Sequence, residues 1–264
     1  MIPKIIHYCW FGNNPKPKKV LKNIEDWKEK LPDYKFVEWN DSHIKLINNQ
    51  YVSEAYEAKK FAFVSDFFRI YALLTEGGIY IDTDVTISKS FDSFLDLDFF
   101  SCYENWREII HPISTATLGA VKNNPFIKEI LDTYENDKFI KNGMPDLTTN
   151  VERITTLLKN KNLVSEPYNK FDTLKLSSKE IIFPSHFFCE NIEGYDNYCV
   201  HEFYASWKDD VEDISIQTEV KKAFKVKFKL NKKVVFVKLK QETISNKILF
   251  SFSFNQKKYA FIII

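Results

Sequence analysis

Glycine and proline are scarce in this chain, with six Gly and nine Pro among 264 residues. Because these two residues permit or impose unusual backbone geometry, their scarcity predicts few special turns. No apolar run reaches the roughly 20 residues that a membrane-spanning helix needs. Residues 1–7 lead directly into an expected strand, without the charged and apolar regions of a signal peptide. We therefore expect a cytoplasmic protein.

Cysteine is rare too, and its spacing excludes the usual cysteine chemistry. No two cysteines form a CxxC pair, so neither a zinc site nor a disulfide framework is expected. We interpret the four as reduced, buried thiols; they are Cys9, Cys102, Cys189 and Cys199.

The chain as a whole has no large excess of positive or negative charge, but its two ends differ. The net charge is +1, so no overall field attracts nucleic acid. Residues 211–264, however, contain 12 Lys, no Arg and four acidic residues, a formal charge of +8, whereas residues 1–210 carry −7. This contrast predicts a main domain of residues 1–210 and a Lys-rich appendage of residues 211–264.

The appendage alternates apolar residues with Lys from Phe224 onward, which is the period of a β-strand. Individual Lys residues fit the edges of strands, where they prevent aggregation. The Lys residues taken together also fit docking on anionic lipid, because each Lys near a membrane surface contributes about 1 kcal/mol to binding. The sequence predicts a small β appendage and leaves peripheral membrane contact open.

The main domain begins with alternating strands and helices. This order predicts an α/β fold: a single Rossmann-like, mostly parallel sheet flanked by helices. Ligands of such sheets bind beyond the carboxyl ends of the strands. The expected strands are 4–11, 34–39, 79–85 and 181–188, the last interrupted by Pro184, and the expected helices are 17–31, 42–48, 54–76, 125–134 and 147–158.

The most informative motif follows an apolar run after Gly77 and Gly78, which mark the start of a strand. Asp82 and Asp84 are two residues apart, so on a regular strand they would point to the same face. Two carboxylates this close are costly unless a cation neutralises them. A divalent cation with oxygen ligands can do so while binding a diphosphate. A solvated loop with two free carboxylates is the alternative.

The helix expected at 54–76 has no Gly or Pro and ends at Gly77. Asp66 and Arg69 share one side of this apolar helix. They could form a simple ion pair. Charged residues in so apolar a setting also fit a binding site, because carboxylates accept from sugar hydroxyls and guanidinium groups bind phosphate.

Two aromatic segments complete the candidates. Trp10 ends the first strand, where it can pack in the core or stack on a nucleobase. Residues 200–207 gather His201, Ser206 and Trp207, which could complete a metal shell or contact a diphosphate. We expect structural roles for the remaining histidines, which are His7, His43, His111 and His186.

These segments together resemble the DxD-containing sugar transferases of glycosyltransferase family 32, which include capsule and lipopolysaccharide enzymes and yeast mannosyltransferases. The similarity rests on 5–12, on Trp27-Lys28 followed by Leu31-Pro32-Asp33-Tyr34, on 62–69, on 77–85, and on His201 through Ser206-Trp207. The glucosyltransferase domains of clostridial toxins contain a related central block. The resemblance covers residues 3–207; Asp26 replaces the serine of the family pattern, and 105–190 match only in pieces.

The resemblance implies a GT-A fold, a nucleotide-sugar donor with UDP favoured over GDP, a divalent cation (Mn²⁺ or Mg²⁺), and retention of anomeric configuration. Asp66, Arg69 and Asp84 would be the catalytic residues. Asp84 would be a direct metal ligand, with Asp82 and either His201 or Ser206 completing the shell. The donor would be bound by Trp10 at the nucleobase, Asp66 and Arg69 at the sugar, Tyr80 and Asp82 near the ribose, and Ser206 and Trp207 at the diphosphate.

The function predicted is therefore metal-dependent transfer of a sugar to a glycan acceptor, lipid-linked or free, in bacterial surface polysaccharide synthesis. No residue is expected to act as a covalent nucleophile, and no nucleic acid is expected as a partner. Three alternatives remain: a toxin-like transferase acting on a protein, a nucleotide-sugar-binding module without catalysis, and a membrane-associated scaffold that uses residues 211–264.

Overall fold

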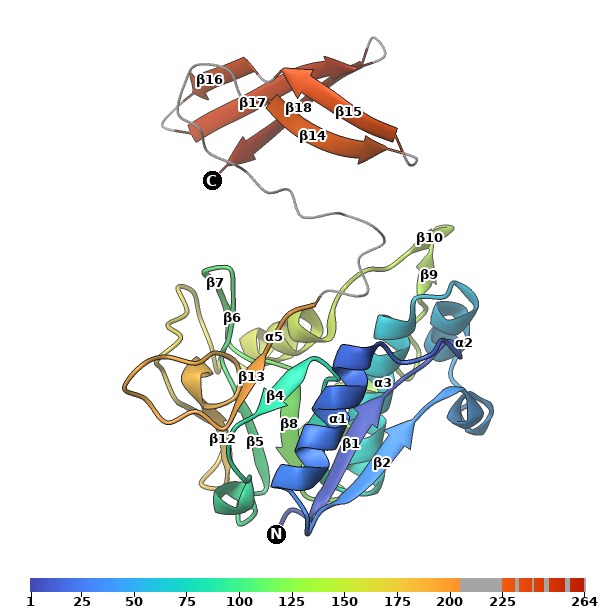
Figure 1. Ribbon diagram of the computed structural model, residues 1–264, viewed down its shortest axis with the longest axis vertical. Helices are drawn as coiled ribbons and strands as arrows, with labels where there is room; N and C mark the ends of the chain where they lie inside the picture. The colour runs from blue at the N-terminus through green and yellow to red at the C-terminus, as the bar shows by residue number, and fades with distance from the viewer. Residues whose placement is uncertain (205–224, 231–232, 239, 245–246, 255–256, 264) are drawn as a thin grey trace. The chain divides into compact units, whose positions relative to one another are not determined.

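The chain divides into two compact units, Met1–Trp207 and Lys208–Ile264, which we describe separately. A computed structural model describes residues 1–204 and, as backbone strands, 225–230, 233–238, 240–244, 247–254 and 257–263. Figure 1 shows the elements of both units.

The first unit is built on a seven-stranded sheet with the order β11-β12-β5-β8-β3-β1-β2. Strands β2, β1 and β3 are mutually parallel, and β12 is parallel to β5. Strand β8 lies antiparallel between β3 and β5, and β11 is antiparallel to β12. Five of the seven strands thus share one direction, which confirms the mostly parallel sheet. The strands are β1 (Ile5–Cys9), β2 (Lys35–Trp39), β3 (Gly78–Ile81), β5 (Phe99–Cys102), β8 (Thr117–Ala120), β11 (Leu174–Lys175) and β12 (Glu180–Phe183).

Helices cover both faces of this sheet (Figure 1). Alternate residues of β1 and β3 point to opposite faces, as the strand period requires. Ile6 and Ile79 pack with Trp27 of α1 (Lys18–Lys30), whereas Cys9 and Tyr80 pack in the cluster of α3 (Phe61–Thr75). The strands that lead to the binding motif are therefore held between two apolar layers.

The prediction of one long helix over 54–76 is wrong. The chain forms α2 (Gln50–Glu57) and then α3, with a break at Ala58–Lys60. Lys59 adopts a positive φ of 58°, its N–H donates to Tyr56 O, and Lys60 N–H donates to Ala55 O. This bonding pattern closes the end of a helix, usually with glycine in the left-handed position. Because a lysine occupies that position, the sequence carries no visible stop signal.

The strand expected at 79–85 is also shorter than predicted. Strand β3 ends at Ile81, and β4 (Val85–Ile87) begins after a turn that contains both aspartates. Val85 N donates to Asp82 O at 3.0 Å and closes this turn. The carboxylates are thus brought together by a turn, not by the alternation of a strand.

The remaining helices begin where the sequence places their caps. Asn124 caps α4 (Pro125–Asp132), and Thr149 forms a capping box with Glu152 at the start of α5 (Asn150–Asn160). Strand β12 ends before Pro184, so the strand expected at 181–188 is confirmed only up to that proline; a short 3-10 helix, η3 (Ser185–Phe187), follows in place of its second part. The smaller elements are η1 (Asp41–Leu46), η2 (Asp92–Phe94), β6 (Glu104–Trp106), β7 (Ile109–His111), β9 (Ile140–Lys141), β10 (Met144–Pro145) and β13 (Cys199–His201).

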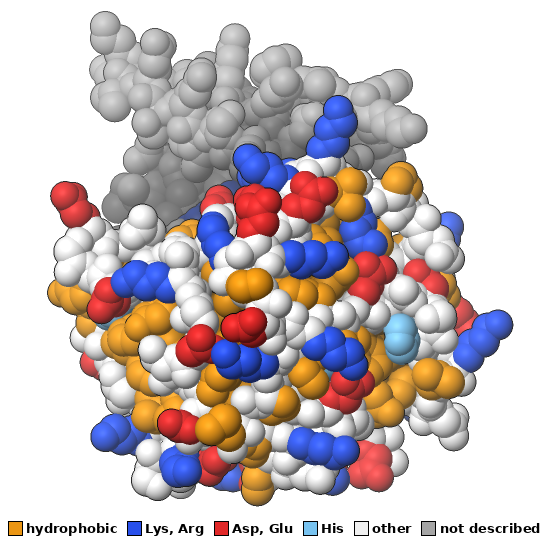
Figure 2. Space-filling model, turned by 60° about the horizontal axis from the view of Figure 1, so that its bottom comes forward, with side chains coloured by type: hydrophobic (Ala, Val, Ile, Leu, Met, Phe, Trp, Pro, Cys, Tyr) orange, Lys and Arg blue, Asp and Glu red, His pale blue; other side chains and the backbone are white. Residues whose placement is uncertain are grey.

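All four cysteines are free thiols and buried, as predicted. Among the described residues, no helix combines the length and apolar character needed to cross a bilayer. On the face shown in Figure 2, basic and acidic side chains are interspersed and hydrophobic atoms are visible between them.

The second unit consists of antiparallel strands in its described segments, which agrees with the predicted β appendage. Strand β14 (Lys225–Leu230) pairs with β15 (Lys233–Lys238). Strand β17 (Lys247–Phe254) pairs with both β16 (Lys240–Ile244) and β18 (Lys257–Ile263).

Candidate active site

The turn between β3 and β4 forms the centre of the candidate site. Asp82 N donates to Ala116 O at 2.8 Å, and Asp84 O accepts from Glu202 N at 3.0 Å. Strand β13 pairs antiparallel with β4, with His201 opposite Val85. This pairing places a histidine from the end of the unit beside an aspartate that precedes it by more than a hundred residues.

Three ligand atoms converge there: one from each of Asp82, Asp84 and His201, all within 4.8 Å of one another. His201 Nε2 lies 3.4 Å from Asp84 Oδ1, and Tyr204 N donates to Asp84 Oδ2 at 3.0 Å. Burial disfavours a charged imidazole, but the Asp84 carboxylate together with Asp82 and Glu104 raises the pKa of His201. Burial likewise opposes ionisation of Asp84, yet the contact with His201 and the Tyr204 N–H lower its pKa.

These residues fit a divalent cation. Carboxylate oxygens are ligands of both Mg²⁺ and Mn²⁺, and an imidazole nitrogen suits a transition-metal ion such as Mn²⁺ better than Mg²⁺. His201 Nδ1 is buried and has no hydrogen-bond partner, so one nitrogen of the ring is left unsatisfied. Hydrogen bonds from the backbone around the carboxylates hold them close together despite their repulsion.

Arg69 connects this turn to α3. Its guanidinium is buried; Nη2 lies 3.0 Å from Asp66 Oδ1, and Nη1 lies 3.3 Å from Asp82 Oδ2. Nη1 also donates to Thr115 O at 2.6 Å, and the guanidinium lies 4.7 Å from the centre of the Tyr80 ring. The Tyr80 hydroxyl in turn donates to Asp82 Oδ1 at 2.7 Å. Both oxygens of Asp82 are therefore oriented by residues that the sequence analysis selected.

Asp66 has a different environment from the one expected of a residue that holds donor hydroxyls. Oδ1 contacts Arg69, and Oδ2 accepts from the backbone N–H of Asn150 at 3.1 Å, at the start of α5. Burial raises the pKa of Asp66 to about 6, although Arg69 opposes this rise. Both oxygens already have partners, so Asp66 links α3 to α5 as well as orienting Arg69.

Glu104 is a site carboxylate that the sequence analysis missed. It lies at the start of β6, is buried, and accepts from Ser114 Oγ at 3.3 Å. Burial raises the pKa of Glu104 to about 7, with His201 and Arg69 opposing the rise and Asp82 adding to it. The one sequence signal for Glu104 as a site residue is its position after a mostly apolar strand, and that pattern is too common to identify a site.

Trp10 follows β1 at the same edge of the sheet as the Asp82–Asp84 turn, because β1 and β3 are parallel neighbours. Its Nε1 donates to Asn14 O at 2.7 Å. It lines a cavity of about 300 Å³ together with Lys16, Glu38 and Asp41. Ser206 and Trp207 lie outside the described residues.

His7 is fully buried and bonded to Gly77 O and Trp39 Nε1, which agrees with the structural role expected for it. His43 completes the capping box of η1 with Asn40. His186 is buried beside the rings of Phe187 and Tyr195.

Comparison with known proteins gives a consistent assignment. Residues 17–101 match the family described as "Glycosyltransferase sugar-binding region containing DXD motif". An uncharacterized glycosyltransferase of Acanthamoeba polyphaga mimivirus is 25% identical over 216 residues, which cover 78% of this chain and 84% of the viral protein. Inositol phosphoceramide mannosyltransferase 3 of Schizosaccharomyces pombe is 29% identical over 140 residues, covering 49% of this chain and 36% of the yeast protein.

Among solved structures, the PaToxG glycosyltransferase has a TM-score of 0.47 and 24% sequence identity, covering 61% of this chain and 71% of that one. The family match contains Asp66, Arg69, Asp82 and Asp84. The resemblance to DxD glycosyltransferases is thereby confirmed.

Proposed function

We propose that this chain, which carries the sugar-binding region of the DXD-containing glycosyltransferases, moves a sugar from a nucleotide-sugar donor to a glycan hydroxyl with the help of a divalent cation. The observation that carries the proposal is the convergence of Asp82, Asp84 and His201 within 4.8 Å. A cation held there would neutralise the carboxylates and the charge that develops on the departing nucleoside diphosphate.

The chain's own residues would orient the donor. Arg69 is fixed by Asp66 and Asp82, so little reorganisation accompanies its interaction with donor oxygens. The cavity at Trp10 lies at the same edge of the sheet, which suits a nucleobase stacked on the indole ring. Ser206 and Trp207 are proposed to contact the diphosphate, on the basis of the sequence resemblance.

We propose retention of configuration by attack on the face that the diphosphate leaves. The acceptor oxygen forms the new bond to the anomeric carbon as the bond to the diphosphate oxygen breaks. The acceptor proton passes to the departing diphosphate. This route needs no protein nucleophile, and positioning of the acceptor supplies much of the rate enhancement.

The donor we propose is a UDP-sugar, and the product a bacterial surface polysaccharide. A cytoplasmic enzyme at the inner face of the membrane would meet lipid-linked acceptors there. The 12 Lys of residues 211–264 support such contact, since clustered Lys residues are attracted to anionic lipid. Co-sedimentation with phosphatidylserine vesicles tests it: the full chain should sediment and residues 1–210 should not, and equal behaviour of both would refute it.

A panel of UDP- and GDP-sugars tests the function directly. Slow hydrolysis of one donor with Mn²⁺, abolished by EDTA and by Asp84→Asn, is the expected result. Asp196→Asn, at an exposed ion pair with Lys89, serves as the control and should keep wild-type activity. Metal-dependent binding without hydrolysis, even with acceptor glycosides present, would favour a binding module. No binding of any donor would refute the proposal.

A further inference from the structure

A second hollow of about 540 Å³ opens on the first unit, away from Trp10. Its walls come from three separate parts of the chain: β7, α5 and the segment around Glu166 and Tyr168. Lys159 of α5 forms an ion pair with Glu166 at 2.7 Å, which ties two of these walls together. We call this hollow the β7–α5 groove.

Two walls of the groove start at the candidate active site. In the β6–β7 hairpin, His111 of the groove pairs directly with Glu104, the buried carboxylate near His201 and Asp82. At the other wall, the first residue of α5, Asn150, donates its backbone N–H to Asp66. With a rise of 1.5 Å per residue, Thr155 in the groove lies roughly 8 Å along α5 from that contact. Figure 1 shows β6, β7 and α5 as neighbouring elements.

The lining of the groove mixes apolar and polar side chains, and its charged residues are mostly acidic. Glu108, Glu152 and Glu166 contribute three carboxylates, against the single ammonium group of Lys159. Such a surface repels a phosphate or a nucleotide. Burial lowers the pKa of His111, although Glu152 opposes this shift, so its imidazole is neutral and can both donate and accept a hydrogen bond.

The groove also contains features that a polyhydroxylated ligand would satisfy. Thr155 Oγ1 is buried without a hydrogen-bond partner. An unsatisfied buried hydroxyl costs about 1–3 kcal/mol, which a ligand hydroxyl could recover. Tyr168 supplies an aromatic ring for the apolar face of a sugar, and carboxylates accept strongly from hydroxyl groups.

We propose that the β7–α5 groove binds the acceptor, and that the acceptor is an uncharged saccharide whose reacting hydroxyl reaches past Glu104 and Asp66 toward the donor. This inference rests on the proposed glycosyltransferase function and adds the acceptor's place and chemical class. Glu104 and Asn150 are positioning residues in this arrangement, because each connects one wall of the groove to the site of donor binding.

Blocking the groove with a bulky group tests the proposal with model glycosides in place of the natural acceptor. All four native thiols are buried, so Thr156→Cys places a single accessible thiol on the exposed lining of the groove. The thiol is labelled with a bulky maleimide, and two rates are compared: donor hydrolysis without acceptor and transfer to a panel of p-nitrophenyl glycosides. Lys22→Cys, at an exposed position of α1, receives the same label as the control.

Labelled Thr156→Cys should hydrolyse donor at the wild-type rate and lose at least about tenfold in transfer, the change that about 1.4 kcal/mol produces. Labelled Lys22→Cys should keep both rates. Equal transfer by the two labelled proteins would overturn the groove assignment. A wild-type enzyme that hydrolyses donor but glycosylates no glycoside would refute an uncharged saccharide as the occupant. Absence of both hydrolysis and donor binding would overturn the proposed function and this inference with it.

A smaller change gives a second readout. Thr155→Val removes the unpartnered hydroxyl with little change of shape, so folding stability should stay equal or rise slightly. The KM for the glycoside should rise several-fold while donor hydrolysis is unchanged. A fall in stability with an unchanged KM would show that the hydroxyl serves the fold alone, against the proposal.

Discussion

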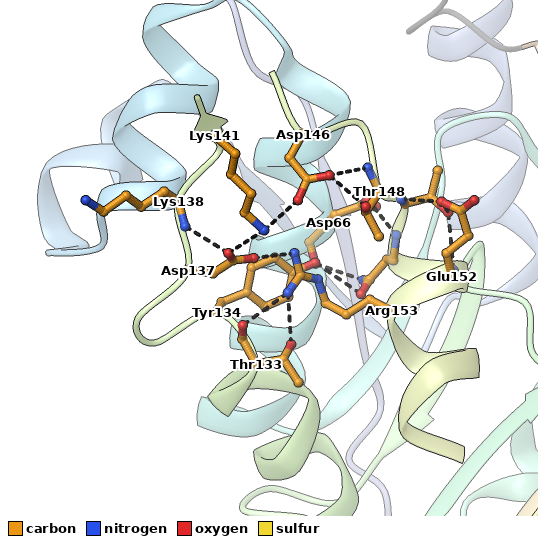
Figure 3. A network of polar contacts seen from close by, with 12 residues as sticks. Asp66, Thr133, Tyr134, Asp137, Lys138, Lys141, Asp146, Thr148, Glu152 and Arg153 are labelled. Atoms are coloured by element: carbon orange, nitrogen blue, oxygen red, sulfur yellow. Dashed lines mark hydrogen bonds and ion pairs between the residues drawn. The ribbon is translucent and has the colours of Figure 1, made fainter. Parts of the chain in front are cut away.

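Two groups of charges in the first unit are balanced very differently: a donor-site cluster that includes Asp66, and a partly exposed network around Arg153. The donor-site cluster contains four carboxylates, on Asp66, Asp82, Asp84 and Glu104, around Arg69 and His201. The Arg153 network, shown in Figure 3, joins Asp137 and Asp146 to Lys141 and Arg153 through contacts of 2.7–2.8 Å. The first has an excess of negative charge, whereas the second has one cation for each carboxylate.

The pKa values express this difference. Burial raises the pKa of Asp66 to about 6 and that of Glu104 to about 7. In the Arg153 network burial acts in the same direction, but bonds from Lys141 and Thr148 bring the pKa of Asp146 down to about 2. The pKa of Asp137 is lowered as well, by Lys141 and Arg153. Each carboxylate of the partly exposed Arg153 network has a cation beside it, whereas Asp66 and Glu104 of the donor-site cluster are under-compensated, as expected where a ligand supplies the missing charge.

The largest difference between the two groups should appear when each loses its arginine. Arg69→Met leaves Asp66 and Asp82 without their shared cation, and breaking a buried ion pair costs about 3–5 kcal/mol. Arg153→Met should cost about 2 kcal/mol, because Lys141 still neutralises Asp137. Urea unfolding of both variants measures the free energies. Equal losses would show that the clusters do not differ in balance.

Arg69→Lys separates folding from function in the same cluster. The positive charge remains, so most of the stability should return. The two-sided contact with Asp66 and Asp82 is lost, because an ammonium group lacks the planar arrangement of donors. Donor hydrolysis should fall about 10²-fold, as loss of about 2.7 kcal/mol of transition-state stabilisation requires. A wild-type rate in this variant would exclude a geometric role for the guanidinium.

A divalent cation should stabilise one group and leave the other unaffected. At a Mn²⁺ concentration of 100 times the Kd, binding to a site that exists only in the folded state raises the free energy of unfolding by about 2.7 kcal/mol. Asp84→Asn should remove this gain, since it takes away a ligand oxygen of the convergent set. Asp146→Asn should keep it. Thermal unfolding with Mn²⁺ and with EDTA decides the matter, and an equal Mn²⁺ response in both variants would place the metal elsewhere.

The features of the two charge groups that the sequence predicts are those between residues close together in the chain. Spacing placed Asp66 and Arg69 on one helix and Asp82 beside Asp84, and caps marked the starts of α4 and α5. The site needs pairings that spacing cannot show. His201 reaches Asp84 only because β13 pairs with β4, and Glu104 enters the cluster only through the position of β6.

The sequence analysis failed where an ordinary residue takes an unusual backbone conformation. Lys59 ends α2 in the left-handed region without the glycine that marks such an end elsewhere. The sequence also predicts strand through the turn at Asp82–Asp84, since the apolar residues on both sides of it continue the strand pattern. In both places long-range packing outweighs local preference: Ala55 of α2 and Val85 of β4 are both fully buried.

The smallest expected effect concerns the acid side of the pH–stability curve. The pKa of Asp146 is lower in the folded state than in the unfolded chain, so its stabilisation is present above about pH 4 and is lost as pH falls toward 2. Asp66 has the opposite sign: its raised pKa makes its contribution decline as pH rises from about 4 to about 6. Asp146→Asn should therefore lower the free energy of unfolding at pH 6 and leave it unchanged near pH 2. The loss at pH 6 should be only about 1 kcal/mol, because the Asp146 side chain retains some contact with solvent. Unfolding free energies of wild type and variant across this range measure the difference. A constant gap at every pH would mean that Asp146 stabilises the fold by its shape and not by its charge.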